Sequence, residues 1–261
     1  MAGRRAVEEW DSFYRTHCQA DVDALAGDYP GERSLYVDVF ELYEFDEAFT
    51  RRLFAEPDAM LDAATEALCA LHESFDRVHV RPTNHPGLLE LRSLRSRHVD
   101  ELVSVEGTVT DVGPVRAAIR TASFECDNCG DLTRREQTGL RLDSPAGCAT
   151  CGESDSFRLR HGRSAIVDVQ RVELTDRSGT RRDDRTARPV PVVLDDDLVD
   201  TVERDTEQRV TGLVRLDGRA DGNRFDLYVE ALTAAEAPGG RRSEQERSAE
   251  RALKEMIESR W

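Results

Sequence analysis

The sequence has 261 residues with 36 basic and 52 acidic side chains, a formal net charge of -16, and 35 of the 36 basic residues are arginine. The one lysine, Lys254, follows Leu253, so no Walker A motif is present, because that motif needs a lysine directly after glycine. Apolar residues make up 39% of the chain, which is enough for one or two folded domains and excludes a wholly disordered protein.

The charge is unevenly distributed along the chain. Residues 1–80 carry a net charge of -11, and residues 81–261 carry only -5. An acid excess with almost no lysine indicates a halophile, since at 1 M salt the Debye length is ~3 Å and self-repulsion is nearly abolished. No apolar stretch resembles a membrane span or a signal peptide. We therefore expect a protein of a high-salt cytoplasm with no membrane partner, and the balanced C-terminal part leaves nucleic acid open as a partner.

Residues 1–78 are predicted to form a small helical bundle. The apolar spacing of Asp58–His72 is that of an amphipathic helix, and a helix from about Asp46 to Leu53 precedes it. Between residues 34 and 42 apolar and polar side chains alternate, which predicts a strand. Bundles bury such stripes by default, so we expect no chemistry from this part.

Residues 79–236 are predicted to form a β-barrel. Short alternating segments with glycine bends and one short helix, at Asp196–Val202, describe a five-stranded OB-fold better than a sandwich. The fold class is therefore α+β, mainly β. The predicted strands are Leu102–Val112, Val115–Phe124, Ser164–Leu174, Pro191–Leu194, Arg209–Leu216 and Arg224–Leu232.

The last two predicted strands are joined by a long hairpin loop, Leu216–Phe225, with arginines at 215, 219 and 224. Residues 237–261 are predicted to be a linker followed by a charged helix. The chain ends directly after that helix, so we expect either a complete short protein or the first part of a longer one.

Four of the six cysteines form two CxxC pairs, Cys126/Cys129 and Cys148/Cys151, separated by eighteen residues. This spacing is typical of structural zinc sites, and Gly130 and Gly152 follow each pair where a turn needs positive φ. We predict one structural Zn²⁺ per chain in a ribbon at residues 125–157, inserted into the barrel. A redox role would leave the duplication unexplained, and a closed Cys₄ shell has no open position for catalysis. The other two, Cys18 and Cys69, are interpreted as buried thiols.

With this ribbon placed, the sequence resembles the N-terminal region of the MCM replicative helicases, particularly the archaeal ones. The likeness covers most of residues 30–235, and it rests on motifs in a shared order: Leu88–Gly130, VDVQ at 167–170, PVVLDDDLVD at 191–200 and RVTG at 209–212.

The resemblance implies a helical bundle, a zinc ribbon and an OB-fold that form a hexamer or a head-to-head double hexamer around single-stranded or duplex DNA. It implies phosphate contacts from Arg215, Arg219 and Arg224 on the hairpin, and from Arg116 and Arg120 on the strand before the ribbon. The alternative for these five residues is ordinary solvated arginine. Arginine suits the role chemically, because its planar fork pairs with phosphate.

Three functions remain open. The first is a DNA-binding, ring-forming MCM module that acts in DNA replication, as a separate protein or as a fragment of a helicase. The second is a regulatory subunit that joins or blocks the ring of a full-length MCM without strong DNA binding. The third is an ATP-driven helicase whose ATPase lies elsewhere. We expect no enzyme activity from these residues alone, since the family's AAA+ motifs are absent. Thr175–Arg188 corresponds to the family loop that communicates with the ATPase domain, and it lacks that loop's usual glutamine.

Overall fold

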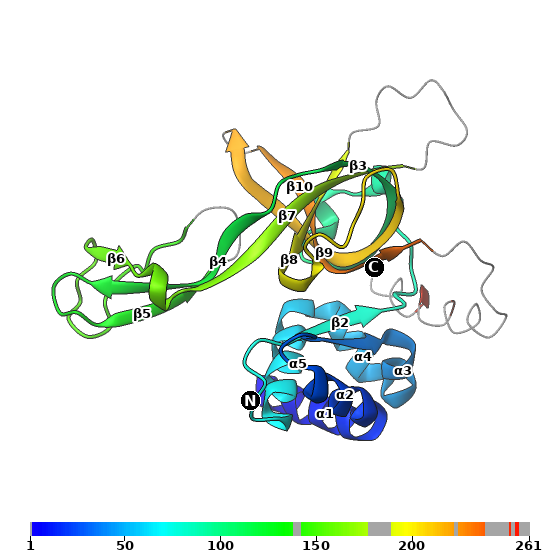
Figure 1. Ribbon diagram of the computed structural model, residues 1–261, viewed down its shortest axis with the longest axis horizontal. Helices are drawn as coiled ribbons and strands as arrows, with labels where there is room; N and C mark the ends of the chain where they lie inside the picture. Colours follow the sequence, from blue (N-terminus) through cyan, green and yellow to red (C-terminus); the bar gives the residue numbers. More distant parts are fainter. Residues whose placement is uncertain are drawn as a thin grey trace.

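The computed structural model describes residues 2–137, 142–176, 189–221 and 224–237, with Arg251, Lys254 and Glu255. For residues 2, 218–221 and 224 it describes the backbone alone. A helical bundle lies below a β-barrel, and a long two-stranded arm extends from the barrel to a small module at its far end (Figure 1).

The N-terminal bundle packs its helices around one aromatic core. Trp10, Phe13 and Tyr14 are fully buried, and Trp10 contacts Phe49 edge to face with ring centroids 4.9 Å apart. Burying such large apolar side chains is what holds short helices in place. The helices are α1 (Ala2–His17), α2 (Gln19–Asp28), α3 (Val39–Phe45), α4 (Glu47–Ala55) and α5 (Pro57–Leu71).

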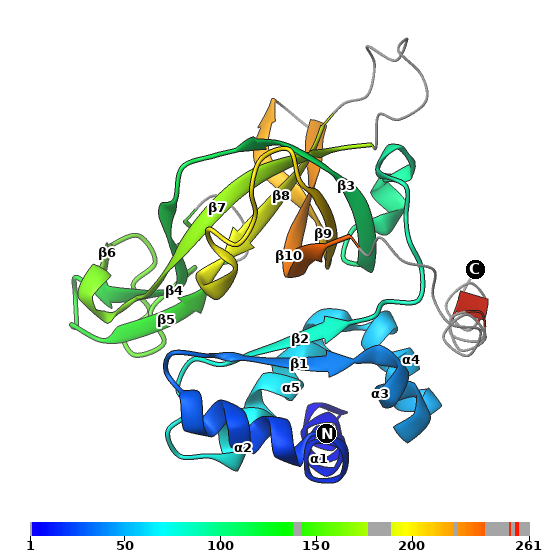
Figure 2. The same cartoon turned by 45° about the vertical axis from the view of Figure 1, so that its right-hand side comes forward.

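Two strands, β1 (Ser34–Asp38) and β2 (His79–Thr83), form a separate parallel sheet above the helices (Figure 2). The strand predicted for residues 34–42 is therefore wrong beyond Asp38. The Asp38 carboxylate accepts a hydrogen bond of 2.7 Å from the backbone N–H of Phe40, and this cap begins α3. This cap ends the strand at Asp38, although the alternation of apolar and polar residues continues in the sequence.

The barrel is closed by five strands, which confirms the predicted α+β class and the OB-fold. The order is β3-β9-β10-β8-β7, and β7 pairs back to β3. The barrel strands are β3 (Leu102–Val112), β7 (Ala165–Thr175), β8 (Val190–Asp195), β9 (Glu207–Asp221) and β10 (Arg224–Glu236), and they surround buried valines and leucines. Three short 3₁₀ turns border these strands, η1 (Leu91–Ser93), η2 (Ser96–His98) and η4 (Asp196–Leu198). The helix predicted at 196–202 is the short turn η4.

The arm is a direct continuation of the barrel. One half of β7 pairs with β3, and its other half pairs with β4 (Arg116–Cys126), so both strands share one partner. Between them the chain bends at Gly113, whose N–H donates to the Arg171 carbonyl at 2.8 Å. The far end adds β5 (Leu132–Glu136), β6 (Phe157–Leu159) and the turn η3 (His161–Arg163). The module is thus fixed to the barrel by an antiparallel ribbon, whose register shifts once between Ile119 and Thr121.

The bundle contacts the barrel through an apolar patch and a polar network. Leu102 and Leu213 of the barrel belong to the bundle's core cluster. Beside them Arg81 of β2 is 2% exposed and donates to the Leu232 carbonyl and the Ser34 hydroxyl, both at 2.6 Å, and to Asp197 of η4. These contacts hold the two parts in one arrangement.

We expect Gly212→Ala to destabilise the barrel. A Cβ at this position of β9 would lie 2.2 Å from the Glu230 carbonyl oxygen on β10, and a backbone atom cannot move away without breaking the pairing. Overpacking of this kind costs ~1–3 kcal/mol or more. Urea denaturation of the variant measures the loss.

The matched control is Gly162→Ala in η3, where nothing lies within 4 Å of the added Cβ. Equal stability of the two variants would contradict the close approach of β9 and β10.

No helix in the described part of the chain is long and apolar enough to cross a membrane. The predicted helix over residues 241–261 lies almost entirely outside the described residues.

Candidate metal centre and arginine sites

The four cysteines of the two CxxC pairs meet at the end of the arm. Each pair makes the same turn: the N–H of Gly130 donates to the Cys126 carbonyl at 2.8 Å, and the N–H of Gly152 donates to the Cys148 carbonyl at 2.9 Å. Both glycines have positive φ, 74° and 76°, which favours glycine at these positions. Two matching turns thereby point two pairs of thiols at one point.

The sulfur geometry fits a tetrahedral metal. All four Sγ atoms lie within 4.8 Å of one another, and the Cys126–Cys151 and Cys129–Cys148 pairs are each 3.6 Å apart. A zinc ion with bonds of ~2.3 Å holds its sulfurs about 3.8 Å apart. The backbone N–H of Glu153 and the Asn128 side chain lower the pKa of Cys151, whereas hydrogen bonds with the other three thiols outweigh the one from the Asp131 backbone and raise the pKa of Cys129.

This cluster confirms that the predicted cysteines form one site able to hold a metal. Each thiol supplies one ligand, so the shell is complete with protein atoms. A closed shell of this kind stabilises structure and leaves no position for a substrate. That the ion is Zn²⁺, one per chain, remains our proposal.

The predicted phosphate contacts Arg120 and Arg215 are both held by carboxylates. Arg120 donates to Glu230 at 2.8 Å and to Asp195. Arg215 donates to Glu230 at 3.1 Å, to Asp100 at 2.7 Å, and to Asp58 of α5. The two arginines therefore share one acid, Glu230.

Burial and ion pairing shift the pKa values of these groups in opposite directions. Burial opposes the charged form of Arg215, but the hydrogen bonds that it donates to Asp58 and the charge of Glu230 outweigh this effect, and the pKa of Arg215 is raised. Burial likewise opposes ionisation of Glu230, but Arg120 and Arg215 lower its pKa. Only 18% of the Arg215 side chain is exposed. In this structure Arg215 and Arg120 join bundle, barrel and arm, and their contact with phosphate is an untested prediction.

The other three predicted arginines differ from this pair. Arg116 begins β4, is exposed, and makes no ion pair with any residue that the structure describes. The side chains of Arg219 and Arg224, on the hairpin, lie outside the described residues. Arg116 is therefore the predicted contact whose charge is available.

Two further arginines on the arm are exposed and have no ion pair within the described ranges, and no sequence motif marked either of them. Arg134 of β5 lies opposite Ser123 of β4. Arg163 of η3 lies on the other side of the same residue, since its carbonyl accepts from the Ser123 hydroxyl at 2.6 Å. Ser123 is seven residues from Arg116 along β4, or ~23 Å of strand. Unpaired arginines are unexpected in a chain with 52 acids.

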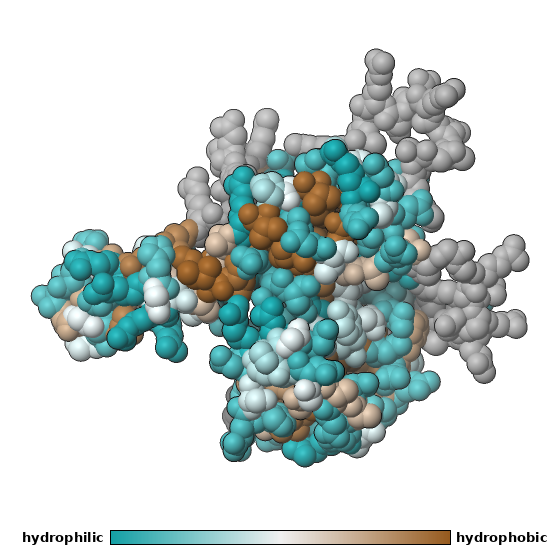
Figure 3. All heavy atoms as spheres, in the orientation of Figure 1, coloured by the Kyte–Doolittle hydropathy of each residue, from teal (hydrophilic) through white to brown (hydrophobic). Residues whose placement is uncertain are grey.

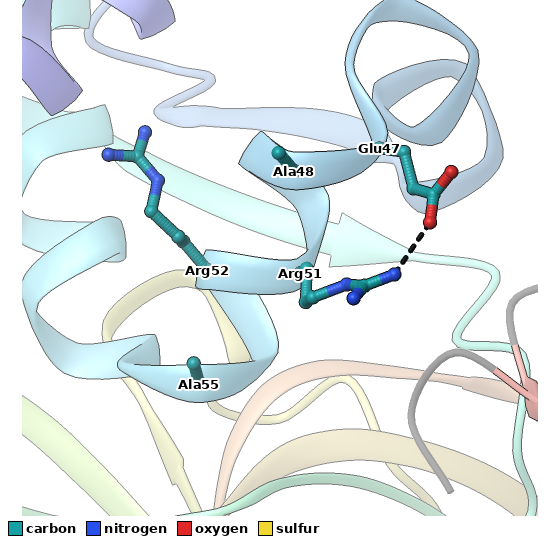
Figure 4. A pocket seen from close by; sticks show the side chains of 5 residues that line it. All are labelled: Glu47, Ala48, Arg51, Arg52 and Ala55. Carbon is teal, nitrogen blue, oxygen red and sulfur yellow. Dashed lines mark hydrogen bonds and ion pairs between the residues drawn. The ribbon is translucent and has the colours of Figure 1, made fainter. Parts of the chain in front are cut away.

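A shallow hollow on α4 is not lined by a group of side chains that could act together in catalysis. Its lining side chains all come from that helix, and Arg51 is turned toward Glu47, to which it donates at 2.6 Å (Figure 4). Arg52 donates to Glu9 of α1 instead. The lining residues are Glu47, Ala48, Arg51, Arg52 and Ala55.

Apolar side chains gather on the arm and on the adjoining barrel surface, whereas the visible bundle surface is mainly hydrophilic (Figure 3). Val115 and Ile166 are each 40% exposed, and Ile166 lies opposite Ile119 across the ribbon.

Known proteins match this chain over most of the described fold. The family description MCM OB domain matches residues 90–217. The chain is similar to the crystal structure of the N-terminal domain of an archaeal MCM, with a TM-score of 0.74 and 26% identity over 90% of this chain and 100% of that one.

The curated relatives that match this chain are longer proteins, and the match covers only part of each. The minichromosome maintenance protein MCM of Saccharolobus solfataricus is 25% identical over 76% of this chain and 32% of the relative. The DNA replication licensing factor MCM4 of Drosophila melanogaster is 29% identical over 70% of this chain and 22% of the relative. The chain thus spans about a third or less of the length of these relatives.

Proposed function

Since this chain is an MCM N-terminal region with an MCM OB domain, we propose that it binds DNA and assembles into a ring around it in DNA replication. The ring is a hexamer or double hexamer that positions or regulates a replicative helicase. This role places the protein at the nucleoid, in a high-salt cytoplasm. It is a binding role, and we assign no reaction to these residues.

The unpaired arginines of the arm support this proposal most directly. Arg116, Arg134 and Arg163 keep exposed positive charge although acids outnumber bases by 52 to 36 in the sequence. Phosphate is the ligand that a guanidinium fork pairs with best. We place the principal DNA contact along β4, with Arg219 and Arg224 of the hairpin as further contacts and Arg120 and Arg215 as secondary ones.

We expect Arg116→Ala to weaken DNA binding and to make it less dependent on salt. Each phosphate contact adds about 0.9 to the slope of log affinity against log salt for a duplex and about 0.7 for a single strand. Fluorescence anisotropy with a labelled 20-nucleotide strand and the matching duplex, between 0.1 and 1 M salt, measures both effects. The triple variant with Arg134→Ala and Arg163→Ala should lower the slope by about two to three.

The control removes three arginines elsewhere. Arg4, Arg51 and Arg97 are exposed and lie on α1, α4 and η2, away from the arm. Their triple alanine variant changes the net charge equally. If both triple variants lose the same affinity, the effect is one of net charge and the contact along β4 is wrong. If the wild type binds no DNA at the lowest salt, the proposed function is wrong.

Self-association is proposed to use the apolar surface of the arm. Val115 and Ile166 are exposed there, and a second copy covering them would remove this surface from water. Sedimentation analysis of the zinc-loaded protein tests assembly. A monomer at all concentrations and with DNA present would contradict the ring.

A regulatory subunit is the second candidate. The observation that favours it is the neutralisation of Arg120 and Arg215 by Asp195, Glu230 and Asp58, which weakens the surface for DNA. Co-sedimentation with a full-length MCM, with and without DNA, separates the two roles. ATP hydrolysis by the purified chain would instead support the helicase alternative.

A further inference from the structure

Three carboxylates enclose the guanidinium of Arg215, two from the barrel and one from the bundle. The Nε atom donates to Glu230 of β10 at 3.1 Å. The Nη1 atom donates to Asp100, which precedes β3, at 2.7 Å and to Asp58 of α5 at 3.0 Å, and Nη2 also donates to Asp58. The two oxygens of Asp58 therefore pair with the two Nη atoms, as a bidentate partner does.

The bidentate edge of an arginine is also the edge with which it pairs to a DNA phosphate. Carboxylate and phosphate both present two oxygens to the parallel N–H groups of the guanidinium. Asp58 takes this position in the folded chain, so a phosphate cannot occupy it at the same time. Arg215 differs in this from Arg116, which is exposed and makes no ion pair with a described residue.

The three partners of Arg215 differ in what it costs them to leave. Glu230 is 22% exposed and also accepts from Arg120, so its departure would break two ion pairs. Asp58 is 54% exposed, and its carboxylate regains water when the pair breaks. It also lies in the first turn of α5, at the positive end of the helix dipole. Asp58 can therefore release Arg215 at small cost, while Glu230 keeps the guanidinium in place.

The closed arrangement also repels DNA. Asp58 and Asp100 are exposed acids beside Arg215, and Asp62 lies one turn farther along α5. Burial and the charges of Glu136 and Asp58 raise the pKa of Asp62, as expected where like charges lie close together. A phosphate that approaches Arg215 therefore meets negative charge first. Removal of any one of these acids weakens that repulsion, so an experiment must separate repulsion from direct competition.

We propose that Asp58 is an autoinhibitory phosphate mimic: it closes Arg215 to DNA, and a DNA phosphate binds Arg215 only by taking the place of Asp58. The inference rests on the proposed DNA binding and adds its regulation. Asp58 belongs to the bundle and Arg215 to the barrel. The exchange therefore breaks an ion pair between these two parts whenever Arg215 contacts DNA.

Asp58→Asn should raise the affinity for DNA, because the amide keeps the size of the side chain and loses the charge that competes with phosphate. The gain is limited by the strength of the lost pair, about 2- to 5-fold for an exposed ion pair. The additional phosphate contact should steepen the slope of log affinity against log salt by about 0.7 for a single strand and 0.9 for a duplex. Fluorescence anisotropy with a labelled 20-nucleotide strand and the matching duplex, between 0.1 and 1 M salt, measures both.

The matched control is Glu66→Gln, which removes the same charge from an exposed position on the same helix, ~12 Å from Asp58 along its axis. It tests repulsion alone and should leave the slope unchanged. Asp58→Asn should also have no effect on the slope in an Arg215→Ala background, where Glu230 keeps its pair with Arg120. Urea denaturation checks that each variant is folded, and Asp58→Ser gives a second substitution that suits the start of a helix.

Two results would overturn the proposal: equal effects of Asp58→Asn and Glu66→Gln, or a steeper slope for Asp58→Asn that persists without Arg215. Either result, with a wild type that binds DNA, leaves the proposed function intact. If neither the wild type nor Asp58→Asn binds DNA at 0.1 M salt, the proposed function fails and this inference fails with it.

Discussion

Removal of the metal is expected to unfold the module at the end of the arm while the barrel and bundle remain folded. The residues of β5, β6 and the two CxxC turns contribute nothing to the two apolar core clusters. We therefore expect their fixed structure to depend on the four thiolates and the proposed ion, since structural zinc contributes ~10–16 kcal/mol of apparent binding free energy in small domains. Hydrogen exchange measured by mass spectrometry, before and after a zinc chelator, locates the change.

The metal prediction has a matched pair of variants. Cys148→Ser removes a buried ligand and should abolish the expected content of one metal ion per chain, measured by elemental analysis, whereas Cys69→Ser in α5 should leave it at one. Exchange should rise in peptides covering residues 126–159 and stay low in β9 and β10. Unchanged protection of the module after complete metal removal would contradict a structural role.

Asp197→Ala is expected to destabilise the whole chain by ~3–5 kcal/mol, since it leaves the guanidinium of Arg81 buried without a carboxylate. Arg81 is 2% exposed, so little water reaches its guanidinium. The same substitution removes the hydrogen bond that the Ser34 hydroxyl donates to Asp197. Urea denaturation at neutral pH measures the free energy of unfolding.

An exposed ion pair is the control for this effect. Arg204 and Asp111 are 2.7 Å apart with side chains 60% and 57% exposed. Such pairs contribute ~0–1 kcal/mol, so Asp111→Ala should change stability little. The double variant Arg81→Met/Asp197→Ala should recover part of the loss, because no buried charge remains. Equal effects of the two aspartate substitutions would contradict the buried pair.

The same aspartate gives an expected dependence on pH. Burial opposes ionisation of Asp197, but Arg81 and the hydrogen bond from Ser34 outweigh it and hold its pKa below the ordinary value. This contribution is present above the unfolded pKa of about 3.9 and is lost as pH falls through the lower folded pKa. The wild type should lose stability below about pH 4, and Asp197→Ala should show a flatter acid limb. Urea midpoints between pH 7 and 2.5 measure this.

Sequence patterns predicted those elements that depend on interactions between residues close together in the chain. The alternation of apolar side chains predicted β3 at its observed bounds, Leu102–Val112. The CxxC spacing predicted that four thiols would meet, because each turn is made within five residues. Where a capping side chain overrides the apolar pattern, as Asp38 does before α3, the prediction of a strand through residue 42 was wrong.

Long-range contacts explain what the sequence could not predict. β1 pairs with β2 across some forty residues, and β7 has both β3 and β4 as partners, which no periodicity reveals. Phe225, near the start of β10, is 50% exposed. From the sequence alone, a phenylalanine in an alternating segment is predicted to be buried, and only the positions of its neighbours in the fold show otherwise.

The sequence by itself determined which four cysteines form the proposed metal site, the strand segments of the barrel and the resemblance to MCM proteins, since these depend on spacing along the chain. Only the tertiary structure decided which arginines are available. Arg215 meets Asp58, 157 positions away, whereas Arg116 and Arg134 meet no carboxylate in the described ranges. The reason is physical: an ion pair forms between charges within about 4 Å, and folding rather than sequence order sets that distance.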